Sequence, residues 1–248
     1  MAQDPFHVPL GFHSQLLKDH STDSGLFVCA RGLGLKGVIK SFMHLCADPR
    51  LLVFVVGLDD DPAASEWPED SQTDDIYFET SAHIHCIKPE STAKERSFIY
   101  DKGGVVLLSS RVLLMDLLLG RIPVPLVTGV IVNSAHRVAE YGLEAFCLYL
   151  LRLQNDTAFI KAFSDNPEFL IRGFAKAEKI LKTLRVSNLV LYPRFHVQVN
   201  DELSHASIEI VEINVACSQQ MKMIQMSILS ILESSIGDVC KDNSVSVD

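Results

Sequence analysis

The segment VIVNSAH (residues 130–136) decides how this chain is expected to fold. Its first three residues are apolar and β-branched, which indicates a strand buried on both faces. Asn133 and Ser134 follow directly, and both residue types favour a tight turn. A helix is expected beyond the turn. The segment therefore predicts one strand, turn and helix of a parallel sheet.

The same pattern recurs outward from this segment in both directions. Apolar runs predict strands, and each is followed by a turn and an amphipathic stretch that predicts a helix. Strands are expected at residues 26–30, 51–56, 82–87, 105–108, 126–132, 158–163 and 188–191. Helices are expected at residues 10–20, 38–46, 91–100, 111–119, 139–153 and 167–184, with Ser91 and Ser110 as N-caps. Alternation of this kind predicts an α/β fold, a parallel sheet with helices on both faces.

Length and composition set the class of protein. The chain has 248 residues, of which 48% are hydrophobic and 21% charged, as in ordinary globular α/β proteins. The most apolar region, residues 105–132, is interrupted by charges and prolines, so no membrane span is expected. The first ten residues lack the features of a signal peptide. Six scattered cysteines without a CxxC pair fit reduced thiols in the cytosol or nucleus.

The net charge of −9 is unevenly distributed. Residues 137–194 hold 9 basic and 6 acidic side chains, so a contact with a polyanion is expected in the middle of the chain. Residues 59–75 hold eight acids and two prolines, which predicts a solvated loop, with an acidic interaction segment as the alternative.

The last part of the chain departs from the α/β pattern. Residues 208–215 alternate apolar and acidic side chains, as in a half-exposed strand. Residues 219–239 predict one amphipathic helix whose apolar stripe lacks a partner helix in this chain. We therefore expect a second domain, truncated soon after it begins.

The glycine-rich turn after the first strand is the first place where a nucleotide could bind. A P-loop needs G-x-x-x-x-G-K-[ST], so that backbone amides, the lysine and the hydroxyl hold the phosphates and Mg²⁺. This turn offers Gly32, Gly34 and Lys36, but Lys36 follows Leu35 and is followed by Gly37. A tight turn that leads into a helix is favoured over a competent ATP site.

The strand end at residues 133–136 is the second such place. Helicase-type NTPases carry Asp-Glu-Ala-His there, in which the Asp helps to hold Mg²⁺ and the Glu orients the attacking water. Asn133 and Ser134 replace the two acids, while Ala135 and His136 remain. The changes at both places predict a motor domain that has lost its ATPase. His136 is assigned a structural or interdomain role at most.

Other side chains give weaker signals. Ser109, Ser110 and Arg111 lie where a strand meets a helix, and a phosphate contact and a simple N-cap explain them equally well. His83 and His85 are expected on the face of a strand opposite Cys86, so no zinc site is predicted. Neither a clustered-acid nuclease site nor a Ser-His-Asp arrangement is visible, and no catalytic residue is predicted.

Taken together, six segments in order resemble the N-terminal helicase-like region of the XPF family of structure-specific DNA repair endonucleases. They are LFVCARGLG (26–34), GGVVLLSSRVLLMDLLLGRIP (103–123), TGVIVNSAHRVAEYGLEAF (128–146), FIKAFSDNPEF (159–169), LVLYPRFHVQV (189–199) and VEINVACSQQMKMIQ (211–225). They reach nearly from end to end of the chain, and the set is specific although each segment alone is weak.

The resemblance implies a superfamily 2 helicase-like fold whose first RecA-like domain lacks the ATPase motifs. This implies a degenerate RecA-like domain over residues 1–205 and the beginning of a helical insert over residues 206–248. The family's GDxxERKxxxD nuclease motif has no counterpart here, nor does the region that binds the small helix-hairpin-helix subunit. No cofactor is therefore expected in this chain, because the family's divalent metal such as Mg²⁺ belongs to the nuclease domain.

The resulting hypothesis is an ATPase-dead module for DNA binding and docking, part of an XPF-like nuclease of nucleotide excision repair in the nucleus. The implied partners are DNA junctions and repair scaffold proteins. The expected DNA contacts are Ser110, Arg111, Arg137 and Arg194. A protein-interaction scaffold without DNA binding and a residual DNA-dependent ATPase, supported only by Lys36, are the alternatives.

Overall fold

A computed structural model describes residues 10–57, 83–88, 90–171, 173–204, 213 and 215–243. Contacts divide the chain into two units, Met1–Ala206 and Ser207–Asp248, and each is described by itself. The acidic loop predicted at residues 59–75 and most of the strand predicted at residues 208–215 lie outside the described residues.

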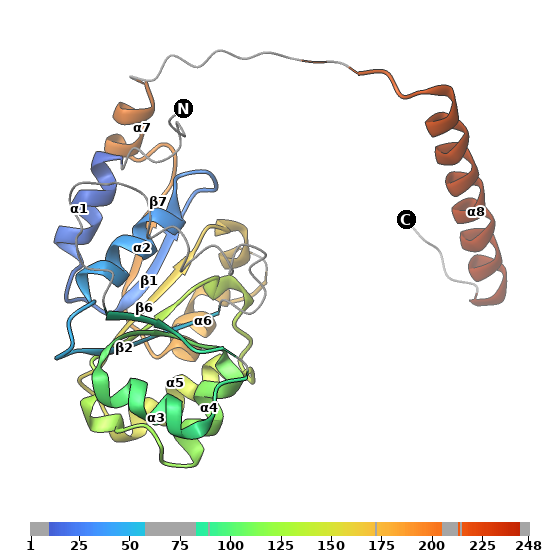
Figure 1. Cartoon of the computed structure of the whole chain (residues 1–248). Helices are drawn as coiled ribbons and strands as arrows, with labels where there is room; N and C mark the ends of the chain where they lie inside the picture. The colour runs from blue at the N-terminus through green and yellow to red at the C-terminus, as the bar shows by residue number, and fades with distance from the viewer. Residues whose placement is uncertain are drawn as a thin grey trace. The chain divides into compact units, whose positions relative to one another are not determined.

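The first unit is built on one parallel sheet of seven strands in the order β3-β4-β2-β5-β6-β1-β7. Figure 1 shows this sheet with helices on both sides. The central strands are short and fully buried, as their β-branched and aromatic residues predict. The strands are β1 Gly25–Cys29, β2 Leu52–Val56, β3 Ile84–Cys86, β4 Gly104–Leu107, β5 Gly129–Val132, β6 Phe159–Ser164 and β7 Leu189–Tyr192. The seven strands predicted between residues 26 and 191 are confirmed.

Helices cover both faces of the sheet, and each face has its own apolar core. One face carries α1 Gly11–Asp19, α2 Leu35–Leu45 and α7 Val197–Ser204. The other carries α3 Ala93–Lys102, α4 Ser110–Leu118, α5 Leu143–Gln154 and α6 Lys176–Leu184. Short 3-10 helices, η4 Val124–Leu126, η5 Ala135–Arg137 and η6 Pro167–Leu170, join several of these elements. The predicted α/β architecture is thereby confirmed.

Three details differ from the prediction. The continuous helix expected at residues 167–184 is instead η6 and α6, separated by backbone in which Gly173 (φ 110°) and Ala175 (φ 51°) leave the helical region. Helix α7 was not predicted. The N-cap of α3 is Thr92, in a capping box with Glu95, rather than the predicted Ser91. The N-cap of α4 is Ser109 rather than the predicted Ser110.

The second unit contains one described helix, α8 Gln219–Asn243, which confirms the predicted amphipathic helix and extends it. Its apolar side chains, such as Ile224, Leu229 and Leu232, are exposed. Of the helices in the described parts of the chain, none is both long enough and apolar enough to cross a membrane.

A buried ion pair fixes the helices around β4. The Asp116 carboxylate is fully buried on α4 and accepts hydrogen bonds from the Arg96 guanidinium (2.7 and 3.0 Å), the Tyr100 hydroxyl (2.8 Å) and Arg121 (2.9 Å). Burial raises the pKa of Asp116, but the hydrogen bonds from Arg96, Tyr100 and Arg121 outweigh it and hold the pKa below its ordinary value. The carboxylate therefore joins α3, α4 and the turn after α4.

We predict that Asp116→Ala lowers the free energy of unfolding by about 3–5 kcal/mol, because it leaves two guanidinium groups without their buried partner. Asp101→Ala, at an exposed position on α3, should change it by less than about 0.5 kcal/mol. Urea titrations of both variants measure the difference. Equal, small effects would show that the network does not stabilise the fold.

A second charged side chain is buried near the amino ends of the strands. Lys161 on β6 is fully buried, and its ammonium donates to the carbonyls of His20 and Asp23 just before β1. It also lies 5.1 Å from the centre of the Phe42 ring and 5.2 Å from that of Phe159. Burial lowers the pKa of Lys161 from its ordinary 10.5 to about 8.

We expect Lys161 to make a contribution to stability that increases with pH. Above about pH 8 its ammonium loses a proton in the folded chain that the unfolded chain keeps, so the contribution of this group to stability rises with pH. Between pH 8 and 9 the free energy of unfolding of the wild type should therefore rise by about 1 kcal/mol relative to that of Lys161→Met. The buried thiols of Cys29 and Cys147, whose pKa values are raised, act in both proteins and cancel in this comparison. Urea titrations of both proteins between pH 7.5 and 9 test this, and identical pH profiles would contradict it.

Candidate functional site

The carboxyl edge of the sheet contains a point where neighbouring strands send their connections to opposite faces. β1 and β6 pair directly. β1 leads into α2 on one face, whereas β6 leads through η6 to α6 on the other. In open parallel sheets, ligands bind in the crevice outside such a switch point. The turns at residues 30–34 and 165–167 are therefore the place to look for a site.

The glycine-rich turn after β1 is held by side chains from distant elements. Gly34 adopts a left-handed conformation (φ 71°) as the N-cap of α2. The buried His13 side chain of α1 meets the carbonyl oxygen of Leu33 at 2.7 Å from Nε2. The Arg194 guanidinium, just after β7, donates to the Arg31 carbonyl at 2.8 Å. Two carbonyls of the turn are thus satisfied by the chain itself.

The residues that follow show which part of a P-loop is missing. Lys36 is exposed in the first turn of α2. Apart from its two chain neighbours and the backbone of α2, no atom lies within 4 Å of the position where a Cβ would stand on Gly37. A serine or threonine would fit there, so crowding does not explain the missing hydroxyl. The predicted turn and helix are present at this position.

The end of β5 is shaped by an amide rather than an acid. Asn133 is buried, its backbone amide donates to the Val56 carbonyl (2.9 Å), and its side-chain Nδ2 donates to the Gly57 carbonyl (3.3 Å). Gly57 has φ 82°, and a Cβ there would lie 2.3 Å from the Asn133 carbonyl oxygen. Ser134, also left-handed (φ 51°), is the N-cap of η5, and Ala135 is fully buried.

His136 joins this turn to the next strand. Its Nδ1 lies 3.0 Å from the Ser164 hydroxyl at the end of β6, and that hydroxyl also accepts from the Asn166 backbone amide at 3.2 Å. Burial lowers the pKa of His136, Asp165 opposes the shift, and Arg137 and Arg31 reinforce it. A neutral imidazole that accepts the hydroxyl proton at Nδ1 fits these contacts and gives His136 a structural role.

The described residues that follow β1, β5, β6 and β7 include exposed charges of both signs. Arg31, Lys36, Arg137 and Arg194 are exposed cations, and Glu140, Asp165 and Glu168 are exposed acids. Across the part of the chain that the structure describes, no group of three or more His, Cys, Asp or Glu side chains could hold a metal ion. The end of β5 itself presents an amide and a hydroxyl, at Asn133 and Ser134, in place of a carboxylate pair.

Ser110 and Arg111 were both predicted to contact DNA, but Ser110 is buried and Arg111 is exposed. Ser110 is 1% exposed, and its carbonyl accepts from the Cys147 thiol of α5 (3.6 Å). The neighbouring Ser109 hydroxyl accepts from the Val112 amide (3.3 Å) and caps α4. A phosphate can therefore reach Arg111, which is exposed, but not the Ser110 hydroxyl in this structure.

Sequence reasoning missed several residues that build the site. Arg31 lies two residues after the end of β1, Ser164 is the last residue of β6 and Asp165 follows it, so their positions at strand ends are visible in the sequence. His13 gives no such signal, because only the fold brings α1 to the turn.

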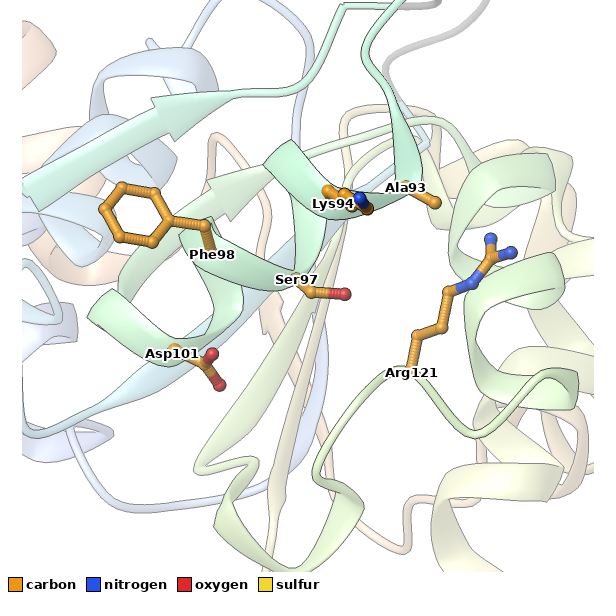
Figure 2. A pocket seen from close by; sticks show the side chains of 6 residues that line it. All are labelled: Ala93, Lys94, Ser97, Phe98, Asp101 and Arg121. Atoms are coloured by element: carbon orange, nitrogen blue, oxygen red, sulfur yellow. The ribbon is translucent and has the colours of Figure 1, made fainter.

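A shallow hollow elsewhere on the same unit has different properties. It has a volume of about 410 Å³ and lies on the surface of α3, where it is lined by Ala93, Lys94, Ser97, Phe98, Asp101 and Arg121. Figure 2 shows the Phe98 ring and the Arg121 guanidinium pointing in different directions. Arg121 is already bonded to Asp116. The lining groups do not converge on one point, and the carboxyl edge stays the candidate site.

Two solved structures of helicases have a similar fold. The Hef helicase domain of Pyrococcus furiosus matches 78% of this chain and 40% of its own length with a TM-score of 0.62 at 15% identity. A hypothetical ATP-dependent RNA helicase of Sulfolobus tokodaii matches 76% of this chain and 54% of its own length with a TM-score of 0.54 at 14% identity. The fold is therefore a RecA-like, helicase-type α/β domain.

Curated relatives specify the family within that class. The DNA repair endonuclease XPF of Cricetulus griseus is 37% identical over 241 residues, which are 96% of this chain and 26% of the relative. XPF of Drosophila melanogaster is 35% identical over 95% of this chain and 23% of its own length, and DNA repair protein rad16 of Schizosaccharomyces pombe is 32% identical over 98% and 27%. No family model matches. The resemblance to the helicase-like region of XPF-type proteins is confirmed, and the chain spans about a quarter of these relatives.

The hydrogen bond of the Asn133 side chain should contribute to the stability of the fold. Asn133→Asp replaces the Nδ2 donor with a carboxylate that cannot bond the Gly57 carbonyl, and should destabilise the fold by about 1–3 kcal/mol. Asn200→Asp, at an exposed position on α7, should change stability by less than about 0.5 kcal/mol. Thermal and urea unfolding compare the two. If both variants are as stable as the wild type, the amide is not needed at the strand end.

Proposed function

We propose that this chain is a helicase-like module without ATPase activity that binds DNA and docks other proteins for an XPF-like structure-specific repair endonuclease. It would act in nucleotide excision repair in the nucleus. The observation that carries the proposal is the carboxyl edge. Asn133 and Ser134 stand where a helicase-type ATPase has its acids, and Arg31, Arg137 and Arg194 are basic groups at the same edge.

The sign of the charge distinguishes a Mg-nucleotide site from a site for a nucleic-acid backbone. A Mg-nucleotide site needs carboxylates that hold the metal, whereas a nucleic-acid backbone needs only cationic donors. Arg137 follows β5, Arg194 follows β7 and Arg111 follows β4. The backbone positions of these three arginines therefore lie along one edge of the sheet. Phosphates of a DNA strand are spaced along its length and suit such a row.

The names of the relatives supply the biological setting. The curated relatives are DNA repair proteins, several of them named as endonucleases. By extension, we propose junctions between single-stranded and double-stranded DNA as the substrate to which this module contributes. Repair scaffold proteins would be its docking partners. The cutting metal, such as Mg²⁺, and the small helix-hairpin-helix subunit would belong to other parts of an XPF-like protein.

Charge reversal along the edge tests the DNA half of the proposal. Fluorescence anisotropy with labelled fork and duplex DNA should show binding that weakens as salt increases. Arg111→Glu, Arg137→Glu and Arg194→Glu should each weaken it, and each lost phosphate contact should reduce the slope of log K against log salt by about 0.9. Melting temperatures check the fold, since Arg194 also bonds the Arg31 carbonyl.

Arg50→Glu is the matched control. Arg50 is exposed and precedes β2, so it lies at the opposite, amino edge of the sheet. Equal weakening by this variant, or binding without salt dependence, would contradict the assignment of the edge. Binding of protein partners without DNA would favour the pure scaffold. DNA-dependent ATP hydrolysis that Lys36→Ala abolishes would instead favour a residual ATPase.

A further inference from the structure

The outward face of α5 carries a stripe of large apolar side chains. Leu143, Phe146, Tyr149 and Leu153 are 45%, 43%, 40% and 62% exposed. Their spacing of three to four residues places them on one side of the helix, opposite the core residues such as Leu148 and Leu151. A stripe of this kind is typical of a surface that binds another protein.

Helix α4, which packs beside α5, also carries exposed apolar side chains. Met115 and Leu118 on α4 and Leu119, its C-cap, are 49%, 57% and 54% exposed. Two neighbouring helices thus both direct large apolar residues away from the sheet. We call this set of seven residues on α4 and α5 the α4–α5 surface.

The other neighbour of α5 supplies positive charge. On α6 and its C-cap, Lys176, Lys179, Lys182 and Arg185 are exposed, against one exposed acid, Glu178. The Arg185 guanidinium lies 5.1 Å from the centre of the Tyr149 ring and so connects the basic helix to the apolar stripe. Lys182 pairs with Glu178 at 2.6 Å, and the α6 side of the apolar surface keeps a net positive charge from Lys176, Lys179 and Arg185.

We propose that the α4–α5 surface binds an acidic amphipathic helix of a partner protein. Its apolar side chains would lie on α4 and α5, and its acids would face α6, where Lys179 and Arg185 are exposed. This is the mode in which an amphipathic helix is recognised through residues spaced three and four apart. The inference rests on the docking half of the proposed function and deepens it by naming the surface and the chemistry of the partner.

The aromatic geometry favours a peptide over single-stranded nucleic acid. Phe146 and Tyr149 stack on each other with ring centres 6.4 Å apart and planes at 17°, and Arg185 lies over Tyr149. Their faces are thus already partly occupied, whereas a base needs a free ring face on which to stack. Leu143 and Leu153 provide no stacking surface, but they suit aliphatic side chains.

Labelled peptides of defined design test the proposal on the full chain. The probe is a set of 18-residue amphipathic helices with Leu and Phe on one side and Glu along one border. A matched set carries Lys in place of Glu. Fluorescence anisotropy should show that the acidic set binds and the basic set does not. Phe146→Ser/Tyr149→Ser should weaken binding at least about tenfold. Lys179→Glu/Lys182→Glu should weaken it about threefold to tenfold and reduce its salt dependence.

Leu45→Ser is the control, since Leu45 is a 54% exposed apolar residue on α2 at the other face of the sheet. The proposal is overturned if no acidic peptide binds, if the basic set binds as well, or if Leu45→Ser weakens binding equally. Two results with Phe146→Ser/Tyr149→Ser would also overturn it. In the first, sedimentation shows that the variant no longer self-associates while peptide binding is unchanged. In the second, the variant loses binding of an oligonucleotide while peptide binding is unchanged. Fork DNA binding, measured in parallel, should stay unchanged, which separates this surface from the carboxyl edge.

Discussion

Burial of the sheet on both faces is the constraint on which this structure depends. Because all seven strands are parallel and helices cover each face, β1, β2, β4 and β5 have no side chain exposed to solvent. The strands can present chemistry only where they end. The carboxyl ends collect the glycine-rich turn, the Asn133 turn and the Ser164 turn at one edge. Even the charged residue within a central strand, Lys161, is fully buried and serves the turn before β1.

The same constraint explains which parts of the fold the sequence predicted. Strands buried on both faces need continuous apolar runs, so VIVNSAH and its counterparts are unambiguous. The break between η6 and α6 was hidden, because Phe169, Ile180 and Leu184 keep apolar residues near helical spacing across it. Ser109 and Ser110 have the same side chain, so the sequence does not show which of them is the N-cap of α4. Only the backbone shows that Ser109 accepts from Val112 while Ser110 is buried.

The candidate site was predictable in position but not in its contacts. Arg194 and Arg31 are 163 residues apart in sequence, and His13 and Leu33 are 20 apart, so no local pattern relates them. The fold brings α1 and the end of β7 to the same turn because α1, α2 and α7 share one face of the sheet. The backbone amide of Phe12 donates to the Glu202 carboxylate at 2.7 Å and ties α1 to α7. Sequence therefore located the strand ends, and the packing of helices decided which side chains meet there.

The geometry of the edge also bears on why its shape persists without the acids of an ATPase. In a nucleotide-binding domain, phosphates and Mg²⁺ contribute to ordering the strand ends that contact them. Here protein groups join the turns to one another. The Asn133 amide bonds the end of β2 through Gly57, and His136 meets the hydroxyl at the end of β6. An aspartate at position 133 could not make the first of these bonds, because it has no donor. The asparagine therefore presents no carboxylate to a metal ion and contributes a hydrogen bond between the ends of β5 and β2. One side chain thus determines both the charge and the hydrogen bonding of this strand end.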